Sequence, residues 1–167
     1  FIAETNGLIV SAATTSLANG NIDIRTAAGA FTVSGAVSAH GSGDVTLVAT
    51  GGLLTANAAI SSTTGDISLT GGTGATHNLS GDLTTTGVGT ITVTATTGNI
   101  AMVDGTVYST GSGTVTLTAA TNIVLAEITT TSSTIGLTAT AGSITDITGA
   151  ETANITSSGT ATLSAAT

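Results

Sequence analysis

One short phrase recurs along the whole 167-residue chain and constrains the fold more than any other feature. It consists of a Gly or Ser, a small polar residue, an apolar residue, any residue and a second apolar residue. Its seven copies start 20–26 residues apart, at Gly20–Ile24, Gly43–Leu47, Gly65–Leu69, Gly89–Val93, Gly113–Leu117, Ser133–Leu137 and Gly159–Leu163. A repeat of this length is typical of proteins that stack one supersecondary unit on the next.

Each copy alternates apolar and polar residues, which predicts a β-strand with opposite faces buried and exposed. Two further apolar columns share the spacing, so each repeat is expected to hold three short strands separated by Gly, Asn, Ser and Thr corners. One column runs through Leu8, Phe31, Leu53, Ile100, Ile123 and Ile144, with an irregular fourth copy near Leu79. The other runs through Leu17, Val37, Ile60, Leu83, Val107, Ile128 and Ile155.

These patterns predict an all-β fold, a parallel β-helix (solenoid) of about seven coils, each with three short strands in ~23 residues. Residues 1–167 are expected to form a single segment. A β-sandwich of short antiparallel strands is the competing fold, and it requires hairpin turns between neighbouring strands. The hairpin dipeptides Asn6–Gly7 and Asn19–Gly20 fall at the predicted coil corners instead.

Composition excludes several functions. The chain has a single cation, Arg25, against nine carboxylates, so it cannot neutralise the phosphates of a nucleic acid. It contains no Cys, which removes disulfides, thiolate metal sites and thiol nucleophiles. No apolar run approaches the roughly 20 residues that a membrane-spanning helix needs, so membrane insertion is not expected.

The phrases Gly43–Leu47, Gly65–Thr70 and Gly89–Ile100 resemble the repeats of large secreted bacterial β-helix proteins of the filamentous haemagglutinin type. The resemblance extends over nearly the whole chain. It implies a long extracellular fibre at the bacterial surface, used in adhesion or as a structural element.

The two ends of the chain also resemble an internal junction. Gly159–Thr167 followed by Phe1–Glu4 parallels Gly113–Thr121 followed by Asn122–Glu127. This parallel predicts that Phe1 and Ile2 lie on the second face of the coil, and that the chain is one unit of a longer tandem or head-to-tail array. Chance similarity between low-complexity segments is the alternative.

The ionisable residues do not predict a catalytic or metal site. Asp44 and Asp66 share a column beside the coil corners, where capping and solubility account for them. Gly71–Thr76 lacks the Asp of the Ca²⁺-binding nonapeptide repeat. His40 and His77 are expected in surface loops of different coils, with no partner for acid–base chemistry. We therefore expect no enzymatic activity, no cofactor and no metal.

The most distinctive surface feature is a set of outward threonines on the first face. A possible surface-binding ladder comprises Thr46, Thr70, Thr92, Thr94, Thr116, Thr118, Thr138 and Thr162. Such Thr-x-Thr arrays resemble those of β-helical ice-binding proteins, although Thr also suits any outward strand position. Asn78 and Asn154 match the N-glycosylation triplet and are possible glycosylation sites.

The sequence therefore predicts a secreted structural protein, a stiff β-solenoid rod in an extracellular bacterial fibre or adhesin shaft. Its expected partners are identical units joined end to end, with a host surface or glycan as a further candidate. The alternative is a binding module that uses the outward Thr ladders to bind ice or glycan.

Overall fold

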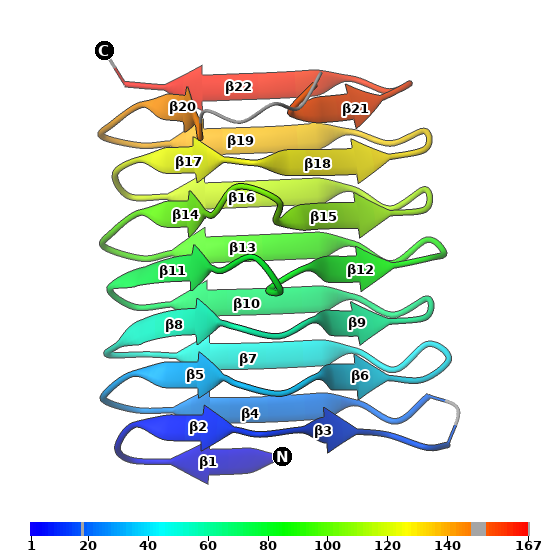
Figure 1. Ribbon diagram of the computed structural model, residues 1–167, viewed down its shortest axis with the longest axis vertical. Helices are drawn as coiled ribbons and strands as arrows, with labels where there is room; N and C mark the ends of the chain where they lie inside the picture. Colours follow the sequence, from blue (N-terminus) through cyan, green and yellow to red (C-terminus); the bar gives the residue numbers. More distant parts are fainter. Residues whose placement is uncertain (18, 148–152, 167) are drawn as a thin grey trace.

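The computed structural model describes residues 1–17, 19–147 and 153–166, which form strands and turns and no helix. The chain winds into a solenoid of about seven coils of ~23 residues, with three strands in each coil (Figure 1). Strands of successive coils pair in parallel, so three sheets run the length of the rod. The predicted fold class is confirmed, and the antiparallel sandwich is excluded.

The first sheet carries the recurring phrase. In spatial order it contains β1 (Ile2–Glu4), β4 (Ile22–Thr26), β7 (Val45–Ala49), β10 (Ile67–Gly71), β13 (Ile91–Ala95), β16 (Val115–Ala119), β19 (Ile135–Ala139) and β22 (Ala161–Ala165). Its register matches the alignment of the seven copies residue by residue, from Ile22 opposite Val45 to Ile135 opposite Ala161. Ile, Val and Leu point inward and alternate with outward polar residues, as a period of two requires.

The other two sheets are built from shorter strands. The second sheet contains β2 (Leu8–Val10), β5 (Phe31–Val33), β8 (Leu53–Ala56), β11 (Gly74–His77), β14 (Ile100–Met102), β17 (Ile123–Leu125) and β20 (Ile144–Asp146). The third sheet contains β3 (Ala13–Thr14), β6 (Val37–Ala39), β9 (Ile60–Ser62), β12 (Leu83–Thr85), β15 (Val107–Thr110), β18 (Glu127–Thr130) and β21 (Ile155–Ser157).

Two predicted inward residues are wrong by one position. Leu54 pairs with Phe31 and is fully buried, whereas Leu53 is exposed. Likewise Tyr108, and not Val107, pairs with Leu83 and fills the interior of the third sheet. In both places two adjacent side chains can serve as the inward residue, and the lengths of the corners decide between them.

Two other predicted column members lie outside the interior. Leu17 is exposed, and Ala13 takes its place opposite Val37. In the irregular fourth copy, Ala75 occupies the inward position between Leu54 and Ile100, while Leu79 lies exposed in the following loop. That loop and its counterpart in the next coil bulge from the corner between β11 and β12 and between β14 and β15 (Figure 1).

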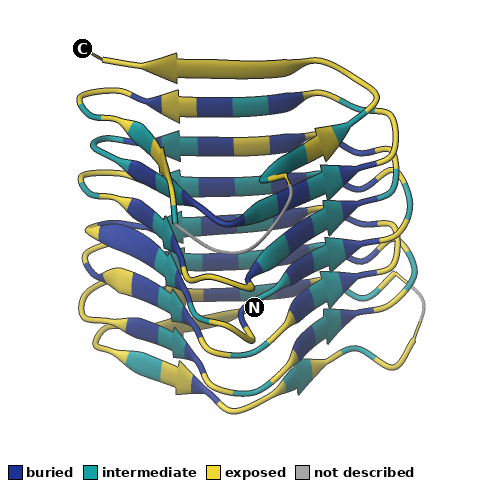
Figure 2. Cartoon of the chain, turned by 45° about the horizontal axis from the view of Figure 1, so that its top comes forward, coloured by how far each residue is buried: buried dark blue, intermediate teal, exposed yellow. Residues whose placement is uncertain are grey.

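The core is a narrow column along the axis of the rod. Aliphatic side chains of the central coils are fully buried, as Leu47, Leu69 and Leu117 illustrate. Burial falls off at both ends, where every residue of β1 and β22 is exposed (Figure 2). Apolar side chains at positions that are buried in the inner coils are therefore exposed in the two end coils.

The N-terminal residues correct one prediction. β1 lies in the first sheet, with Ile2 opposite Ile24, and not on the second face of the coil. The parallel with Asn122–Glu127 misplaced it because a three-residue apolar segment fits either strand position.

Candidate functional site

The threonine ladder lies on the outer face of the first sheet, as its register dictates. One column contains Thr46, Thr92, Thr116 and Thr162, and the neighbouring column contains Thr70, Thr94, Thr118 and Thr138. None of these eight hydroxyls donates to or accepts from another group within the described residues. They are therefore available to water or to a ligand.

The ladder is interrupted in the coils on either side of its centre. Val48 and Gly136 break the two columns. At the N-terminal end, the columns continue into Asp23 and Arg25, which form an exposed ion pair with Nε–Oδ1 at 2.8 Å. The uninterrupted part thus extends from β10 to β16, where Ser68 completes the first column.

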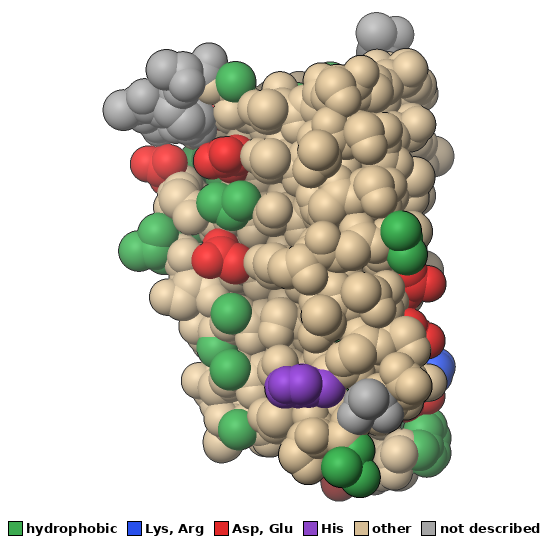
Figure 3. All heavy atoms as spheres, turned by 90° about the vertical axis from the view of Figure 1, so that its right-hand side faces the viewer, with side chains coloured by type: hydrophobic (Ala, Val, Ile, Leu, Met, Phe, Trp, Pro, Cys, Tyr) green, Lys and Arg blue, Asp and Glu red, His purple; other side chains and the backbone are tan. Residues whose placement is uncertain are grey.

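A second hydroxyl column follows the outer face of the third sheet, and the sequence analysis missed it. Its members are Thr14, Ser38, Ser61, Thr84, Ser109, Thr129 and Thr156. Ser61 Oγ donates to Ser38 Oγ at 3.1 Å, so part of this column is bonded within itself. The side of the molecule in Figure 3 is nearly free of charge across its centre, and carboxylates gather along its edges.

A third set of hydroxyls lies at the corner between the third and first sheets, and all of its members except the half-buried Ser157 are buried. The set comprises Ser62, Thr85, Thr110, Thr130 and Ser157. Ser62 Oγ donates to Gly43 O at 2.7 Å, and Thr110 Oγ1 donates to Gly113 O at 2.6 Å. A Ser or Thr two residues after the inward apolar residue of this strand was the available signal, but it is hidden in a chain with 40 threonines.

Side chains at the corner before the first sheet form a hydrogen-bonded ladder along the rod. Asn21 Oδ1 accepts from Asp44 N at 2.9 Å, Asp44 Oδ1 from Asp66 N at 2.9 Å, and Asp66 Oδ1 from Thr90 N at 2.8 Å. Each carboxylate or amide thus satisfies a backbone donor of the next coil. This confirms the corner-capping role predicted for Asp44 and Asp66.

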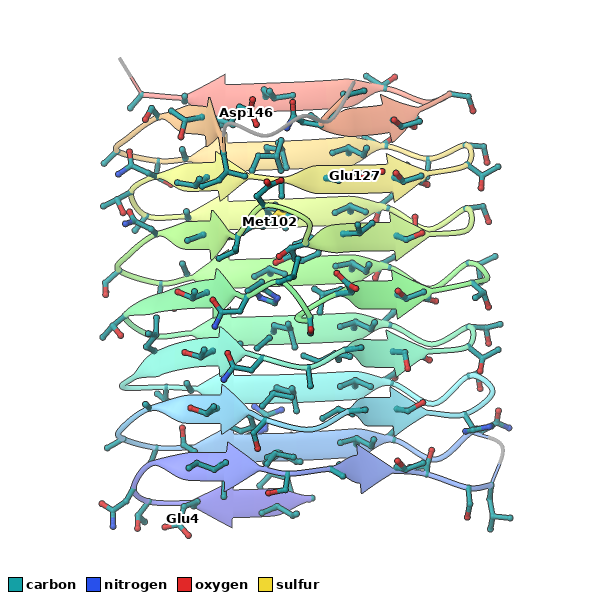
Figure 4. The ribbon with its side chains drawn as sticks, in the orientation of Figure 1. Glu4, Met102, Glu127 and Asp146 are labelled. Atoms are coloured by element: carbon teal, nitrogen blue, oxygen red, sulfur yellow. The ribbon has the colours of Figure 1, made fainter. Side chains whose placement is uncertain are left out.

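The two histidines differ sharply. His40 is exposed, as predicted, whereas His77 lies in β11 and is fully buried, so its predicted surface position is wrong. Its Nδ1–H donates to Gly81 O at 3.0 Å, while Nε2 is buried and has no hydrogen-bond partner among the described residues. Its neighbour in the next coil is Met102, which lies inside the coil in Figure 4.

Tyr108 packs against the His77 ring edge to face, with ring centroids 5.1 Å apart and an interplanar angle of 74°. Its hydroxyl is buried and forms no hydrogen bond with the part of the chain that the structure describes. Burial lowers the pKa of His77 to about 4, partly offset by the bond to Gly81. Burial, together with the negative charge of Asp82, raises the pKa of Tyr108 well above its usual value. Both rings are therefore neutral at physiological pH.

The possible glycosylation sites are both engaged through the nitrogen that glycosylation would modify. Asn78 Nδ2 donates to Asn57 Oδ1, and Asn154 Nδ2 donates to Asp146 Oδ1 at 2.7 Å. Asp146 and Glu127 lie toward the corner between the second and third sheets (Figure 4). Asn154 Nδ2 also donates to Ala126 O at 3.0 Å, so it uses both of its hydrogens and its glycosylation would require breaking one of these bonds.

Apolar hollows lie at the ends of the rod. One of about 370 Å³ at the C-terminal end is lined by Leu125, Ile144, Ile155 and Leu163. Another of about 270 Å³ at the N-terminal end lies beside Phe1, Ile2, Ile22 and Ile24. Both are formed by column residues that lack a covering coil. Among the described residues, no group of three or more His, Asp or Glu side chains could hold a metal ion.

Comparison of the chain with family models, with curated proteins and with solved structures yields no match. Nor do the described residues include a helix of sufficient length and apolarity to span a membrane. A proposal for the function therefore depends on the geometry of the rod alone.

Proposed function

We propose that this chain is a structural segment of an extracellular bacterial fibre or adhesin shaft, and that it forms a stiff rod which assembles end to end. The observation that carries the proposal is the parallel pairing of each strand with its counterpart in the next coil, which makes successive coils repeat one cross-section along a rod.

The backbone hydrogen bonds of the three sheets support a mechanical role. They link every coil to the next, and the inward apolar columns pack along the same direction. Seven coils at about 4.8 Å give a rod roughly 34 Å long, whose stability is distributed over its coil interfaces. Further coils added to such a rod would make the same contacts as the existing ones.

The end coils support assembly. An unpaired strand edge is a template for another strand, and soluble proteins normally cover it. Phe1 is 83% exposed at one end and Leu163 is 52% exposed at the other. Stacking of identical cross-sections would bury both surfaces and pair both edges. The resemblance of the repeats to filamentous haemagglutinin-type proteins supports the extracellular, bacterial-surface setting.

A charge on the open cross-section tests end-to-end assembly. Leu163→Lys places an ammonium group where a single rod leaves it in water but a stacked rod would bury it unpaired. We expect filaments of the 167-residue chain in electron micrographs, and none with Leu163→Lys. Thr116→Lys, on the side of the rod, is the matched control and should assemble normally.

Circular dichroism spectra of both variants should match the parent spectrum, which separates a failure to assemble from a failure to fold. If the parent chain stays monomeric by light scattering at all concentrations, the assembly proposal is wrong. Equal assembly of Leu163→Lys and the parent would contradict the role of the end coils.

A second candidate function is a binding module for ice or glycan, favoured by the unbonded threonine hydroxyls of the first sheet. If that face binds, Thr92→Tyr should reduce thermal hysteresis or glycan binding at least tenfold. Thr84→Tyr on the third sheet is the control and should have no effect. Absence of both activities in the parent protein would eliminate this candidate.

A further inference from the structure

The outer face of the first sheet is shaped for contact with another sheet. Its strands are stacked side by side with little twist (Figure 1). From β4 to β22, each strand of this sheet presents two outward residues, which form the two columns of the threonine ladder. Flat sheets of many strands are unusual and are typically stabilised by stacking on another sheet. A partner with the same architecture would therefore suit this face.

The spacing of the ladder restricts the partner further. Its rows repeat every ~4.8 Å along the rod, which is the distance between neighbouring strands of a sheet. A ligand with another repeat falls out of step with the hydroxyls after a few rows, whereas a second copy of the chain keeps a row opposite every row. Each hydroxyl can both donate and accept, and the eight ladder hydroxyls are unbonded within the described residues.

One strand of the face carries charge. Asp23 and Arg25 on β4 are the charged members of the two columns between β4 and β22, and they form an exposed ion pair. A rotation of 180° about an axis parallel to the rod sets each column opposite the other column of a second copy, at the same height. Asp23 then faces Arg25 of the second copy, and Arg25 faces its Asp23. The four charges alternate in sign.

We propose that two copies of this chain pair side by side as parallel rods, first sheet against first sheet, about a two-fold axis that runs along the rods. Such a contact uses the same surface on both copies and is closed, so association stops at two rods. It lies on the side of the rod and is independent of end-to-end assembly.

An antiparallel pair lacks this charge complementarity. A two-fold axis along the strands sets each column opposite itself. Centred on β4, it places Asp23 against Asp23 and Arg25 against Arg25, and like charges that meet across an interface oppose association. Centred on β13, it places β4 opposite β22, where Thr162 and Ser164 offer no charge. The parallel arrangement is therefore favoured.

The other rows also fit the parallel pair, because each row meets the same row of the second copy with its columns exchanged. Val48 meets Thr46, so that their methyl groups come into contact. Gly136, which leaves the first column short of a side chain, meets Thr138. The two irregular positions of the ladder are thus opposite threonines in the pair.

The edges of the face introduce no conflict. Asp44 and Asp66 lie just before β7 and β10, where they cap the corner. In the parallel pair this edge lies against the opposite edge of the second copy, where Thr50 and Gly72 follow the same two strands. The carboxylates of the two copies are therefore kept on opposite sides of the contact.

The size of the face predicts weak, reversible pairing. Seven strands of five residues form its rows. At about 4.8 Å per strand and 3.3 Å per residue, the face measures roughly 34 by 17 Å, and pairing buries about 1,100 Å² in total. Specific interfaces begin near 1,000 Å². We therefore expect a dimer that dissociates on dilution.

Charge reversal on β4 tests the pairing by sedimentation velocity. Arg25→Asp makes this strand wholly acidic, and Asp23→Arg makes it wholly basic, so that each variant alone sets like charges against each other. We expect the dissociation constant of the dimer to rise at least tenfold in each. An equimolar mixture should restore it to within threefold of the parent value, because every acidic strand then faces a basic one.

Three variants serve as controls. Asp23→Arg/Arg25→Asp exchanges the charges and keeps their complementarity, so its dissociation constant should stay within threefold of the parent value. Thr116→Lys, at the middle of the face, should abolish the dimer without preventing end-to-end filaments. Thr84→Lys on the third sheet should leave the dimer unchanged. Circular dichroism spectra that match the parent confirm folding in each variant.

Several results would overturn the proposal. They are a parent chain without a dimer at its highest soluble concentration, single variants that pair as well as the parent, and a mixture that stays unpaired. An open-ended series of oligomers that Thr116→Lys preserves and Leu163→Lys abolishes would also overturn it, and would support end-to-end assembly alone. A monomeric parent that binds ice or glycan would assign the face to that ligand instead.

Discussion

At the scale of single residues, His77 is the clearest departure from an otherwise aliphatic and hydroxyl-lined interior. Its imidazole has one bonded nitrogen and one buried nitrogen without a partner, and it packs on a tyrosine whose hydroxyl has none. A protonated ring here would bury a charge with no counter-ion in contact. The fold therefore holds His77 neutral.

This position predicts that acid destabilises the protein. The pKa of His77 is about 4 in the folded state, against 6.5 for the free side chain. Above pH 6.5 the His77 side chain is neutral in both the folded and the unfolded state, so it does not lower the free energy of unfolding. Between pH 6.5 and 4 only the unfolded state gains the proton, so the free energy of unfolding should fall by about 3 kcal/mol.

Urea denaturation at a series of pH values measures this effect. His77→Met should remove most of the dependence, because Met102 already occupies the same position in the next coil. His40→Gln should leave it unchanged, since His40 is exposed. An unaltered pH dependence in His77→Met would show that another group is responsible.

At the scale of one coil, the corners impose stricter requirements than the strands. At the end of β10, a Cβ added to Gly71 would lie 1.8 Å from the carbonyl oxygen of Gly74. In the middle of β19, a Cβ added to Gly136 would have nothing within 4 Å. Gly71 is thus required at its position, whereas Gly136 can be replaced.

The predicted effects of substitution have opposite signs. Gly71→Ala should lower the free energy of unfolding by about 3 kcal/mol or more, because backbone must move to relieve the clash. Gly136→Thr should raise it by about 1 kcal/mol, since a β-branched residue replaces a flexible one on an open strand face. Thermal and urea denaturation test both, and destabilisation by Gly136→Thr would contradict the open geometry.

Sequence periodicity predicts the first sheet from β4 to β22, but not β1, and predicts the other two sheets less well, for a physical reason. The copies of the phrase contain no insertions, so Ile22 through Ala161 align without ambiguity. In the other strands, Leu53–Leu54 and Val107–Tyr108 offer two apolar neighbours, and only the corner length selects the inward one. The strand register of the first sheet predicts the outward position of its threonines. The burial of His77 depends instead on the irregular corner after β11, which periodicity does not predict.

At the scale of the whole molecule, stability should be graded along the axis. A solenoid is held by contacts between neighbouring coils, and an end coil has a neighbour on one side only. We expect backbone amides of β10 and β13 to exchange with deuterium at least a hundredfold more slowly than those of β1 and β22. Uniform exchange along the chain would instead indicate a single cooperative unit.

The winding path has a consequence for a rod held at its two ends. The described coils are hydrogen-bonded to their neighbours, and the chain has no Cys to cross-link them, so a sufficient pull would peel turns away one after another. Releasing a turn of about 23 residues frees roughly 75–80 Å of extended chain. We therefore expect a rod built this way to yield in many small steps under load.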